Sequence, residues 1–192
     1  CGAGRYVDAA GSDDASDCIA CVAGTYVEGD GSFLESNCTA CAAGKHSSVV
    51  GSGSEGDCID CVAGKYVDVV GSDAASDCID CVAGKYVEDA GSDAASGCID
   101  CDVGRYVEGT GSFLASNCTY CAPGRYNNLT GASGCRWCQR GTEHEREGAT
   151  NDGWCRACAP GQADEDQNAA TRCTQCSAGE YANALSQCEM CS

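Results

Sequence analysis

The spacing Cys-x-x-Cys recurs every 20 residues along most of the chain, and this fixed period restricts the fold to a tandem array of small units. The first residue, Cys1, falls in register as the second cysteine of such a pair, so we expect the chain to begin inside a repeat. The regular pairs are Cys18/Cys21, Cys38/Cys41, Cys58/Cys61, Cys78/Cys81, Cys98/Cys101 and Cys118/Cys121, and less evenly spaced pairs follow at Cys135/Cys138, Cys155/Cys158, Cys173/Cys176 and Cys188/Cys191.

Large apolar residues are scarce in this array. Val, Ile, Leu and Phe together number 23 of 192 residues, whereas cysteine alone supplies 21, and the formal net charge is −18. Without cysteine such a composition is typical of disordered chains, so covalent cross-links must replace a large core. The sequence predicts a small disulfide-rich fold, mostly irregular with short β-hairpins, built as an elongated tandem-repeat rod in an oxidising, extracellular compartment.

A representative unit runs from Cys61 to Cys78. Tyr66–Val67 is predicted to be a short strand, and Gly71–Ser72 the turn that returns the chain to the next cysteine. Each unit is therefore predicted to be a hairpin closed at its base. Gly64, like the glycine at the same place in the other units, is expected to occupy a backbone geometry that a side chain would obstruct.

The cysteine count suggests a pairing scheme. If the second cysteine of each pair bonds to the first cysteine of the next, ten closed loops form and Cys191 is left unpaired or paired outside these residues. The same spacing also fits four-thiolate zinc sites, and zinc remains the alternative. The expected bridges are Cys1–Cys18, Cys21–Cys38, Cys41–Cys58, Cys61–Cys78, Cys81–Cys98, Cys101–Cys118, Cys121–Cys135, Cys138–Cys155, Cys158–Cys173 and Cys176–Cys188.

The motif Cys-x-x-Gly-x-Tyr followed by Cys-x-x-Cys resembles the ephrin-receptor-like, or tumour-necrosis-factor-receptor-like, cysteine-rich repeats of extracellular proteins. The resemblance covers the units from Cys1 to Tyr126 and returns between Cys176 and Cys188. It implies a loop closed between the cysteine before Gly-x-Tyr and the cysteine that begins the next pair, which agrees with the ten-bridge scheme. Those receptors alternate this loop with a doubly bridged module, and this chain does not, so ligand binding is not carried over.

Three triplets fit the N-glycosylation acceptor pattern, and N-glycans are expected candidates at their asparagines, Asn37, Asn117 and Asn128. The repeat tyrosines are predicted to pack on the neighbouring disulfides, with a ligand-binding aromatic ladder as the alternative; they are Tyr6, Tyr26, Tyr66, Tyr86, Tyr106, Tyr126 and Tyr181. The Lys or Arg before it and the Asp between paired cysteines are predicted to form weak exposed pairs, with mating between neighbouring rods as the alternative. Acidic turns would suit calcium, but no EF-hand or repeat-in-toxin pattern supports it, and no other cofactor is expected.

The chain offers little for catalysis, and we predict that it is not an enzyme. Its two histidines are His46, at a tyrosine position, and His144, whose charged run Glu143–Glu147 is predicted to be a surface loop. Net charge −18 argues against a nucleic-acid partner. No apolar run approaches the roughly 18 residues of a membrane span, so direct membrane insertion of this segment is not expected.

The spacing divides the chain into regular repeats at 1–134, divergent repeats at 135–175, and a final repeat with the start of another at 176–192. The divergent segment holds both tryptophans, and we expect a bend or a partner contact there. The array predicts a secreted structural glycoprotein that assembles with copies of itself or related repeat proteins in an extracellular filament, mastigoneme-like surface hair or coat. The alternative is the stalk or ligand-binding ectodomain of a cell-surface receptor or adhesin.

Overall fold

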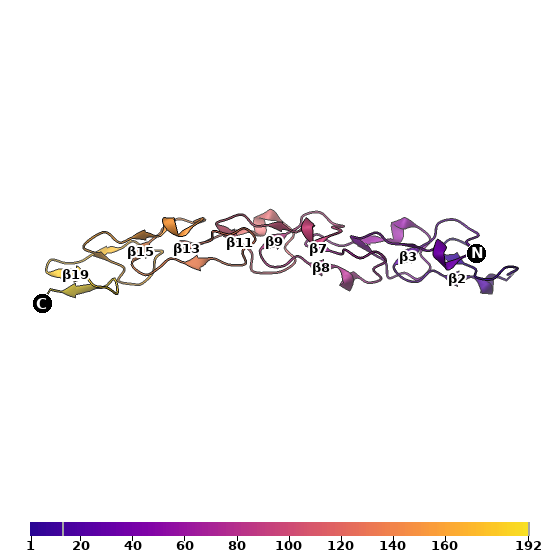
Figure 1. Ribbon diagram of the computed structural model, residues 1–192, viewed down its shortest axis with the longest axis horizontal. Coiled ribbons are helices and arrows are strands. Elements are labelled where there is room, and N and C mark those ends of the chain that lie inside the picture. Colours follow the sequence, from indigo (N-terminus) through magenta and orange to yellow (C-terminus); the bar gives the residue numbers. More distant parts are fainter. Residues whose placement is uncertain (13, 192) are drawn as a thin grey trace. The chain divides into compact units, whose positions relative to one another are not determined.

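The computed structural model describes residues 1–12 and 14–191, which fold into repeated two-stranded antiparallel hairpins (Figure 1). The predicted small disulfide-rich, mostly irregular fold of repeated hairpin units is confirmed. The paired strands are β1 (Arg5–Tyr6) with β2 (Ile19–Ala20), β3 (Thr25–Tyr26) with β4 (Thr39–Ala40), β5 (Lys45–His46) with β6 (Ile59–Asp60), β7 (Lys65–Tyr66) with β8 (Ile79–Asp80), β9 (Lys85–Tyr86) with β10 (Ile99–Asp100), β11 (Arg105–Tyr106) with β12 (Thr119–Tyr120), β13 (Arg125–Tyr126) with β14 (Arg136–Trp137), β15 (Thr142–Glu143) with β16 (Arg156–Ala157), β17 (Gln162–Ala163) with β18 (Thr174–Gln175), and β19 (Glu180–Ala182) with β20 (Cys188–Met190).

A single turn of 3-10 helix precedes the returning cysteine in most repeats. Such a turn redirects the chain within three residues, which brings the second strand back beside the first. These turns are η1 (Ala15–Asp17), η2 (Glu35–Asn37), η3 (Glu55–Asp57), η4 (Ala75–Asp77), η5 (Ala95–Gly97), η6 (Ala115–Asn117) and η7 (Asp152–Trp154).

The first strand of each hairpin begins one residue earlier than the sequence predicted. In the repeat closed by Cys61, β7 covers Lys65–Tyr66 rather than Tyr66–Val67. Val67 leaves the ladder because its N–H donates to the carbonyl of Ser92, in the next repeat, at 3.1 Å. The turn at Gly71, with φ of 77°, is where the sequence placed it.

Successive repeats are joined by backbone hydrogen bonds as well as by the chain itself. Three backbone N–H···O bonds link each regular hairpin to the one after it, and we call this junction between successive repeats a joint. Residues at equivalent positions form the same three bonds at the next joint. Between the repeats 61–78 and 81–98, Gly64 donates to Val87 at 2.9 Å, Val67 to Ser92 at 3.1 Å, and Gly91 to Cys61 at 2.8 Å.

Glycine also allows contact between repeats that are two steps apart. Gly64, with φ of 88°, lies so close to Gly111 that a Cβ on Gly64 would stand 2.2 Å from the Gly111 carbonyl oxygen. No side chain fits at that distance. The expectation that this glycine occupies an obstructed backbone geometry is confirmed, and the obstructing group is the backbone of another repeat.

The buried core consists largely of sulfur and valine. The second cysteine of each regular pair is fully buried, and Val67 and Val87 pack against the disulfides of their own repeats. Tyr66 packs on the cluster that includes Cys81 in the following repeat, as predicted for the repeat tyrosines. Tyr181 is the exception, with 47% of its surface exposed.

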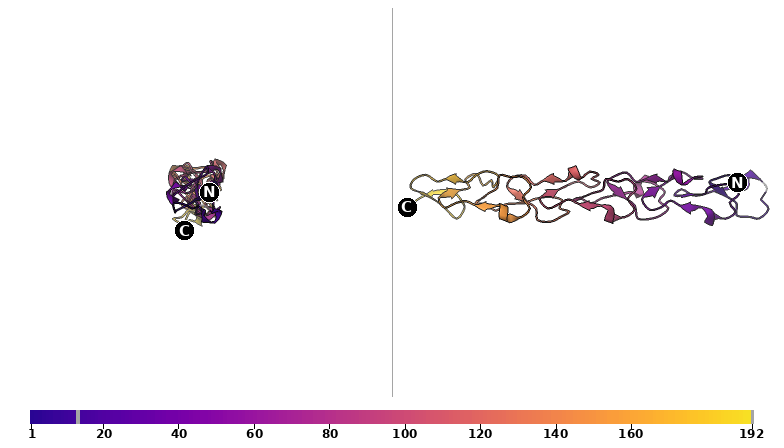
Figure 2. Two further views of the ribbon diagram at one scale, coloured as in Figure 1. Left: turned by 90° about the vertical axis from the view of Figure 1, so that its right-hand side faces the viewer. Right: turned by 90° about the horizontal axis from the view of Figure 1, so that it is seen from above.

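The chain divides into two compact units. The first comprises Cys1–Val82, Tyr86–Ile99 and Thr110–Ala115, and the second comprises Ala83–Lys85, Asp100–Gly109 and the chain from Ser116 onward. Within the first unit, the hairpins from β1/β2 to β7/β8 follow one another in chain order (Figure 2).

Candidate functional site

Ten disulfide bonds join the cysteines of residues 1–12 and 14–191, and each closes one loop. They connect the same cysteines that the ten-bridge scheme pairs, with a sequence separation of 17 in the regular repeats and of 12 to 17 beyond Cys121. The bonded sulfurs are not available as the thiolates that zinc requires. Cys191 is a free, exposed thiol.

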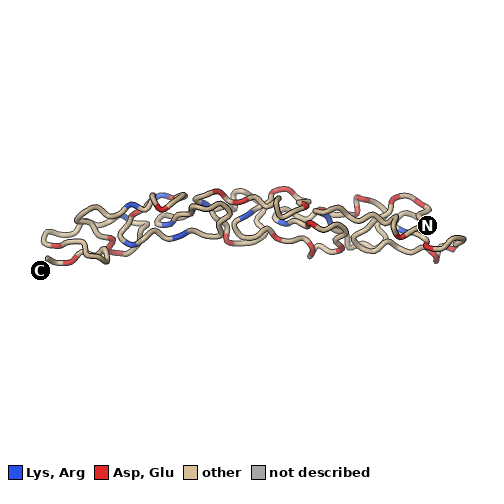
Figure 3. The backbone as a smooth tube through the Cα atoms, viewed as in Figure 1, with Lys and Arg blue, Asp and Glu red and all other residues tan. Residues whose placement is uncertain are grey.

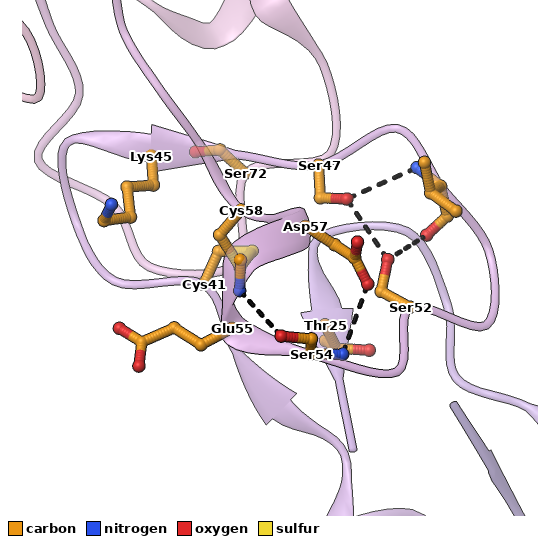
Figure 4. The surroundings of a disulfide bond; sticks show 12 residues. Thr25, Cys41, Lys45, Ser47, Ser52, Ser54, Glu55, Asp57, Cys58 and Ser72 are labelled. Atoms are coloured by element: carbon orange, nitrogen blue, oxygen red, sulfur yellow. Dashed lines mark hydrogen bonds between the residues drawn. A yellow bond between two sulfur atoms is a disulfide. The ribbon is translucent and has the colours of Figure 1, made fainter. Parts of the chain in front are cut away.

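The bridge between Cys41 and Cys58 shows how the local sequence presents a cysteine to its partner (Figure 4). Ser54 caps η3 by accepting a hydrogen bond from the N–H of Gly56 at 3.1 Å. Asp57 completes the capping box by accepting from the N–H of Ser54 at 3.2 Å. The capped turn ends at Cys58, so it fixes the direction in which that side chain leaves the loop.

Oppositely charged residues of the regular repeats pair within one hairpin. Their side chains face each other across the two strands and remain about one third to one half exposed, as predicted for weak surface pairs. The hydrogen bond to Asp60 raises the pKa of Lys45, and the hydrogen bond from Lys65 lowers the pKa of Asp80. The pairs are Lys45–Asp60 at 2.7 Å, Lys65–Asp80 at 2.6 Å and Lys85–Asp100 at 2.5 Å.

One interior position of the repeat holds an apolar residue in some repeats and a polar residue in others. It is the third residue after the glycine of each unit, and most regular repeats place a valine there, which is buried at Val27, Val67 and Val87. Four other repeats bury a polar residue instead, with exposed fractions of 0% to 6%. They are Ser47, Asn127, His144 and Asp164.

Most of these polar side chains have hydrogen-bond partners in the fold. Asn127 donates from Nδ2 to the carbonyls of Arg105 and Leu129, at 2.8 and 2.9 Å. Asp164 accepts from the N–H of Gly141 at 3.0 Å and from that of Asn168 at 2.9 Å. These bonds offset the cost of burying polar groups.

His144 differs, because its Nε2 is buried and has no hydrogen-bond partner in the described chain. The prediction that His144 lies in a surface loop is wrong, since only 6% of its surface is exposed. The residue takes the inward valine position after Gly141, and its backbone N–H donates to Ala169 at 2.6 Å. Desolvation lowers the pKa of the imidazole, and the charge of Arg146 lowers it further.

A cleft of about 890 Å³ opens beside this histidine, and charged side chains form much of its lining. Trp154 forms one wall, and its ring meets the His144 ring edge-on, with centroids 5.7 Å apart. The volume lies within the usual range for ligand sites, but such sites are mostly apolar and this lining is not. The charged residues at the cleft are Glu143, Glu145, Arg146, Arg156 and Arg172.

We call this cleft the arginine cleft. Some of its charged side chains have hydrogen-bond or ion-pair partners, and others have none in the described chain. Arg172 donates from Nε to Glu145 at 2.8 Å, and this bond lowers the pKa of Glu145. Glu143 accepts from the backbone N–H of Cys173 at 3.0 Å. Its ladder neighbour Arg156 forms no ion pair among the described residues, and neither does Arg146.

The two tryptophans of the divergent segment lie in different settings. Trp154 belongs to the arginine cleft, whereas Trp137 is 63% exposed and carries the Arg125 guanidinium 3.6 Å above its ring. Sequence reasoning pointed to this segment but missed the cleft arginines. The available signal was composition, since five of the chain's eleven basic residues lie between positions 135 and 175 and all five are arginine.

The predicted glycosylation sites differ in accessibility. Asn37 and Asn128 are exposed, and Asn117 is partly exposed in η6. The middle residue of the first triplet, Cys38, is bonded to Cys21. Glycosylation at these three asparagines stays a prediction.

Neither a cluster of metal-ligating side chains nor a membrane-spanning helix occurs in the part of the chain that the structure describes. Within residues 1–12 and 14–191, no three His, Cys, Asp or Glu side chains gather in a way that could hold a metal ion. The same residues contain no helix with the length and apolar character needed to cross a membrane. The expectations about calcium, cofactors and catalysis stay predictions.

Comparison with protein-family models finds no match for this chain, and comparison with curated proteins finds none either.

Proposed function

We propose that the chain is a structural glycoprotein of the cell exterior, a repeat component of an extracellular filament, mastigoneme-like surface hair or coat. The observation that carries the proposal is the repeated joint. A closed disulfide loop, three backbone hydrogen bonds and a close glycine contact recur from one regular repeat to the next. Chains built this way gain their stability from the contacts between nearby repeats and need no large core.

The chemistry of the cysteines supports an extracellular location. Disulfides at this density persist in oxidising compartments and are rare in the cytosol, where thiols are kept reduced. The proposal includes N-glycans at Asn37, Asn117 and Asn128, which would be added along the secretory route. The likeness to ephrin-receptor-like repeats agrees with the same setting.

Copies of the same chain, or related repeat proteins, are the proposed partners. Of the 23 Val, Ile, Leu and Phe residues, 18 are exposed in the described chain, although the protein has few such side chains to spare. Exposed apolar side chains that recur along an array are suited to lateral contact with a similar array. The net charge of −18 gives no support to a nucleic-acid partner.

Negative-stain microscopy of the native material tests this proposal. Regular rods or fibrils are the expected result, with a subunit repeat that matches the chain. Dispersed, flexible monomers at every concentration would contradict it.

The arginine cleft favours a second candidate function, the ectodomain of a cell-surface receptor or adhesin. A localised site with unpaired arginines beside Trp154 is more typical of a binding module than of a uniform filament component. The coding sequence beyond these residues distinguishes the two functions. A transmembrane helix and a cytoplasmic domain would favour the receptor, whereas further repeats or an assembly domain would favour the filament.

A further inference from the structure

Charge is distributed unevenly along the chain. Residues 1–134 carry twenty Asp or Glu against six Lys or Arg, a net formal charge of −14, whereas residues 135–175 carry seven against five, a net of −2 (Figure 3). Three lysines of the first segment are paired with aspartates in their own hairpins. The regular repeats are thus an acidic surface, and half of their six basic residues are already paired with carboxylates.

The arginine cleft offers the opposite charge. Its two unpaired cations, Arg146 and Arg156, are exposed, and neither side chain donates a hydrogen bond within the described chain. Glu145 is bonded to Arg172 and Glu143 to the backbone N–H of Cys173, and both carboxylates keep their charge, so the three arginines and two glutamates of the cleft sum to a formal charge of +1. Guanidinium groups bind carboxylates in two-pronged pairs, so the cleft suits an acidic segment.

The loop 28–35, in the repeat closed by Cys21 and Cys38, has the negative charge that the cleft would bind. Its sequence is Glu-Gly-Asp-Gly-Ser-Phe-Leu-Glu, and Asp30 and Glu35 are both exposed. Phe33 is 71% exposed, which is unusual for a phenylalanine in a chain with so few aromatic residues. Ser32 anchors the loop, because its carbonyl accepts a hydrogen bond from the N–H of Val7 at 3.1 Å.

We propose that the arginine cleft of one copy binds the acidic, Phe33-bearing loop 28–35 of a second copy. Asp30 and Glu35 pair with Arg146 and Arg156, and the phenyl ring of Phe33 packs on the exposed face of Trp154, a 41% exposed side chain. Aromatic and arginine side chains of this kind dominate the free energy of protein contacts.

The contact joins two different surfaces, so it is heterologous. A heterologous contact that does not close into a ring generates an open chain of subunits. The inference therefore supplies a head-to-tail contact for the filament, and in that sense it rests on the proposed function.

Sedimentation velocity of the full 192-residue chain tests the contact, with protein concentration and salt as variables. We expect concentration-dependent association that weakens between 20 and 500 mM NaCl, a range over which the Debye length falls from about 20 Å to about 4 Å. The double variant R146E/R156E is expected to associate at least about tenfold more weakly. R136E/R140E is the matched control, because it makes the same charge change in the same segment at exposed arginines outside the cleft.

A charge-swap mixture makes the test specific. D30K/E35K alone and R146E/R156E alone should both lose association, and an equimolar mixture should regain it, because each altered surface then meets an oppositely charged one. Non-reducing mass spectrometry and hydrogen exchange must first show that every variant keeps its ten bridges and its amide protection.

Four results would overturn the contact: no association of the unmodified chain, association insensitive to salt, equal losses in R136E/R140E and R146E/R156E, or no recovery in the mixture. Fibrils that persist in R146E/R156E would likewise refute the contact and leave the proposed function standing. A cleft-dependent dimer that never extends would support the contact and refute the filament.

Discussion

The substitution Gly64→Ala probes the joint between repeats most sharply. Alanine at this position must adopt φ of 88°, and its Cβ would stand 2.2 Å from the oxygen and 2.8 Å from the carbon of the Gly111 carbonyl. Both obstructing atoms belong to the backbone, so no rotamer change relieves the overlap. The two repeats must separate or the backbone must distort.

The expected cost has two parts. Left-handed backbone costs about 1–2 kcal/mol for a residue with a Cβ, and forced overpacking adds about 1–3 kcal/mol. The free energy of opening the joint should therefore fall by about 2–5 kcal/mol in Gly64→Ala. Gly29→Ala separates the two parts, because Gly29 has φ of 76° but open space where its Cβ would stand. Only the first part applies there.

Hydrogen exchange read by mass spectrometry measures both variants under non-reducing conditions, because amide protection reports local opening. The reporter amides are those of Gly64, which donates to Val87, and Gly111, which donates to Cys81. The extra 1–3 kcal/mol corresponds to exchange about 5- to 150-fold faster than the left-handed strain alone would produce. Gly109→Ala, with open space around its Cβ, should leave exchange unchanged. Equal exchange rates at the nearest joint in Gly64→Ala and Gly29→Ala would refute the steric account.

Three further predictions concern single interactions. Replacing Cys61 and Cys78 by alanine should lower the free energy of unfolding by about 3 kcal/mol in non-reducing urea melts, and a loss under about 0.5 kcal/mol would contradict a structural role for that bridge. The pKa of His144 is lowered in the fold, so as the pH drops below about 6.5 the unfolded chain binds a proton before the folded chain does, and the free energy of unfolding should fall. In His144→Val, the melting temperature should depend less on pH between about pH 5 and 8. An unchanged pH dependence would refute this role for His144. Lys65→Met removes the exposed pair with Asp80, and urea melts should show a loss of less than about 1 kcal/mol that shrinks further in high salt; a larger, salt-independent loss would mean that the pair is not a simple surface contact.

The repeat joints were predictable because cysteine spacing is a covalent constraint. Neighbouring loops can be closed only if each Cys-x-x-Cys is divided between them, and the bridges in the structure follow that division. The position of Gly64 was predictable for a similar reason, since a glycine at a fixed distance from cysteine in every unit implies a backbone requirement. The identity of the obstructing group, Gly111, was not predictable, because it lies two repeats away and depends on how the hairpins stack.

The prediction for His144 was wrong because it was based on the neighbouring residues. A run of charged neighbours predicts exposure, yet the inward direction is set by the count from Gly141, which places His144 where Val67 lies after Gly64. Aligning the divergent repeats on glycine instead of on charge would have found it. The arginine cleft was hidden for another reason: Arg146 and Arg156 belong to the hairpin β15/β16, Arg172 belongs to the next repeat, and the three meet only in the folded chain.

The most direct test of the account is peptide mass mapping of the native protein without reduction, with its metal content measured on the same sample. The account predicts that each bridge joins the second cysteine of one pair to the first cysteine of the next, as between Cys61 and Cys78, and that no zinc is bound to these residues. Bridges within single Cys-x-x-Cys pairs, or reduced cysteines with stoichiometric zinc, would contradict it.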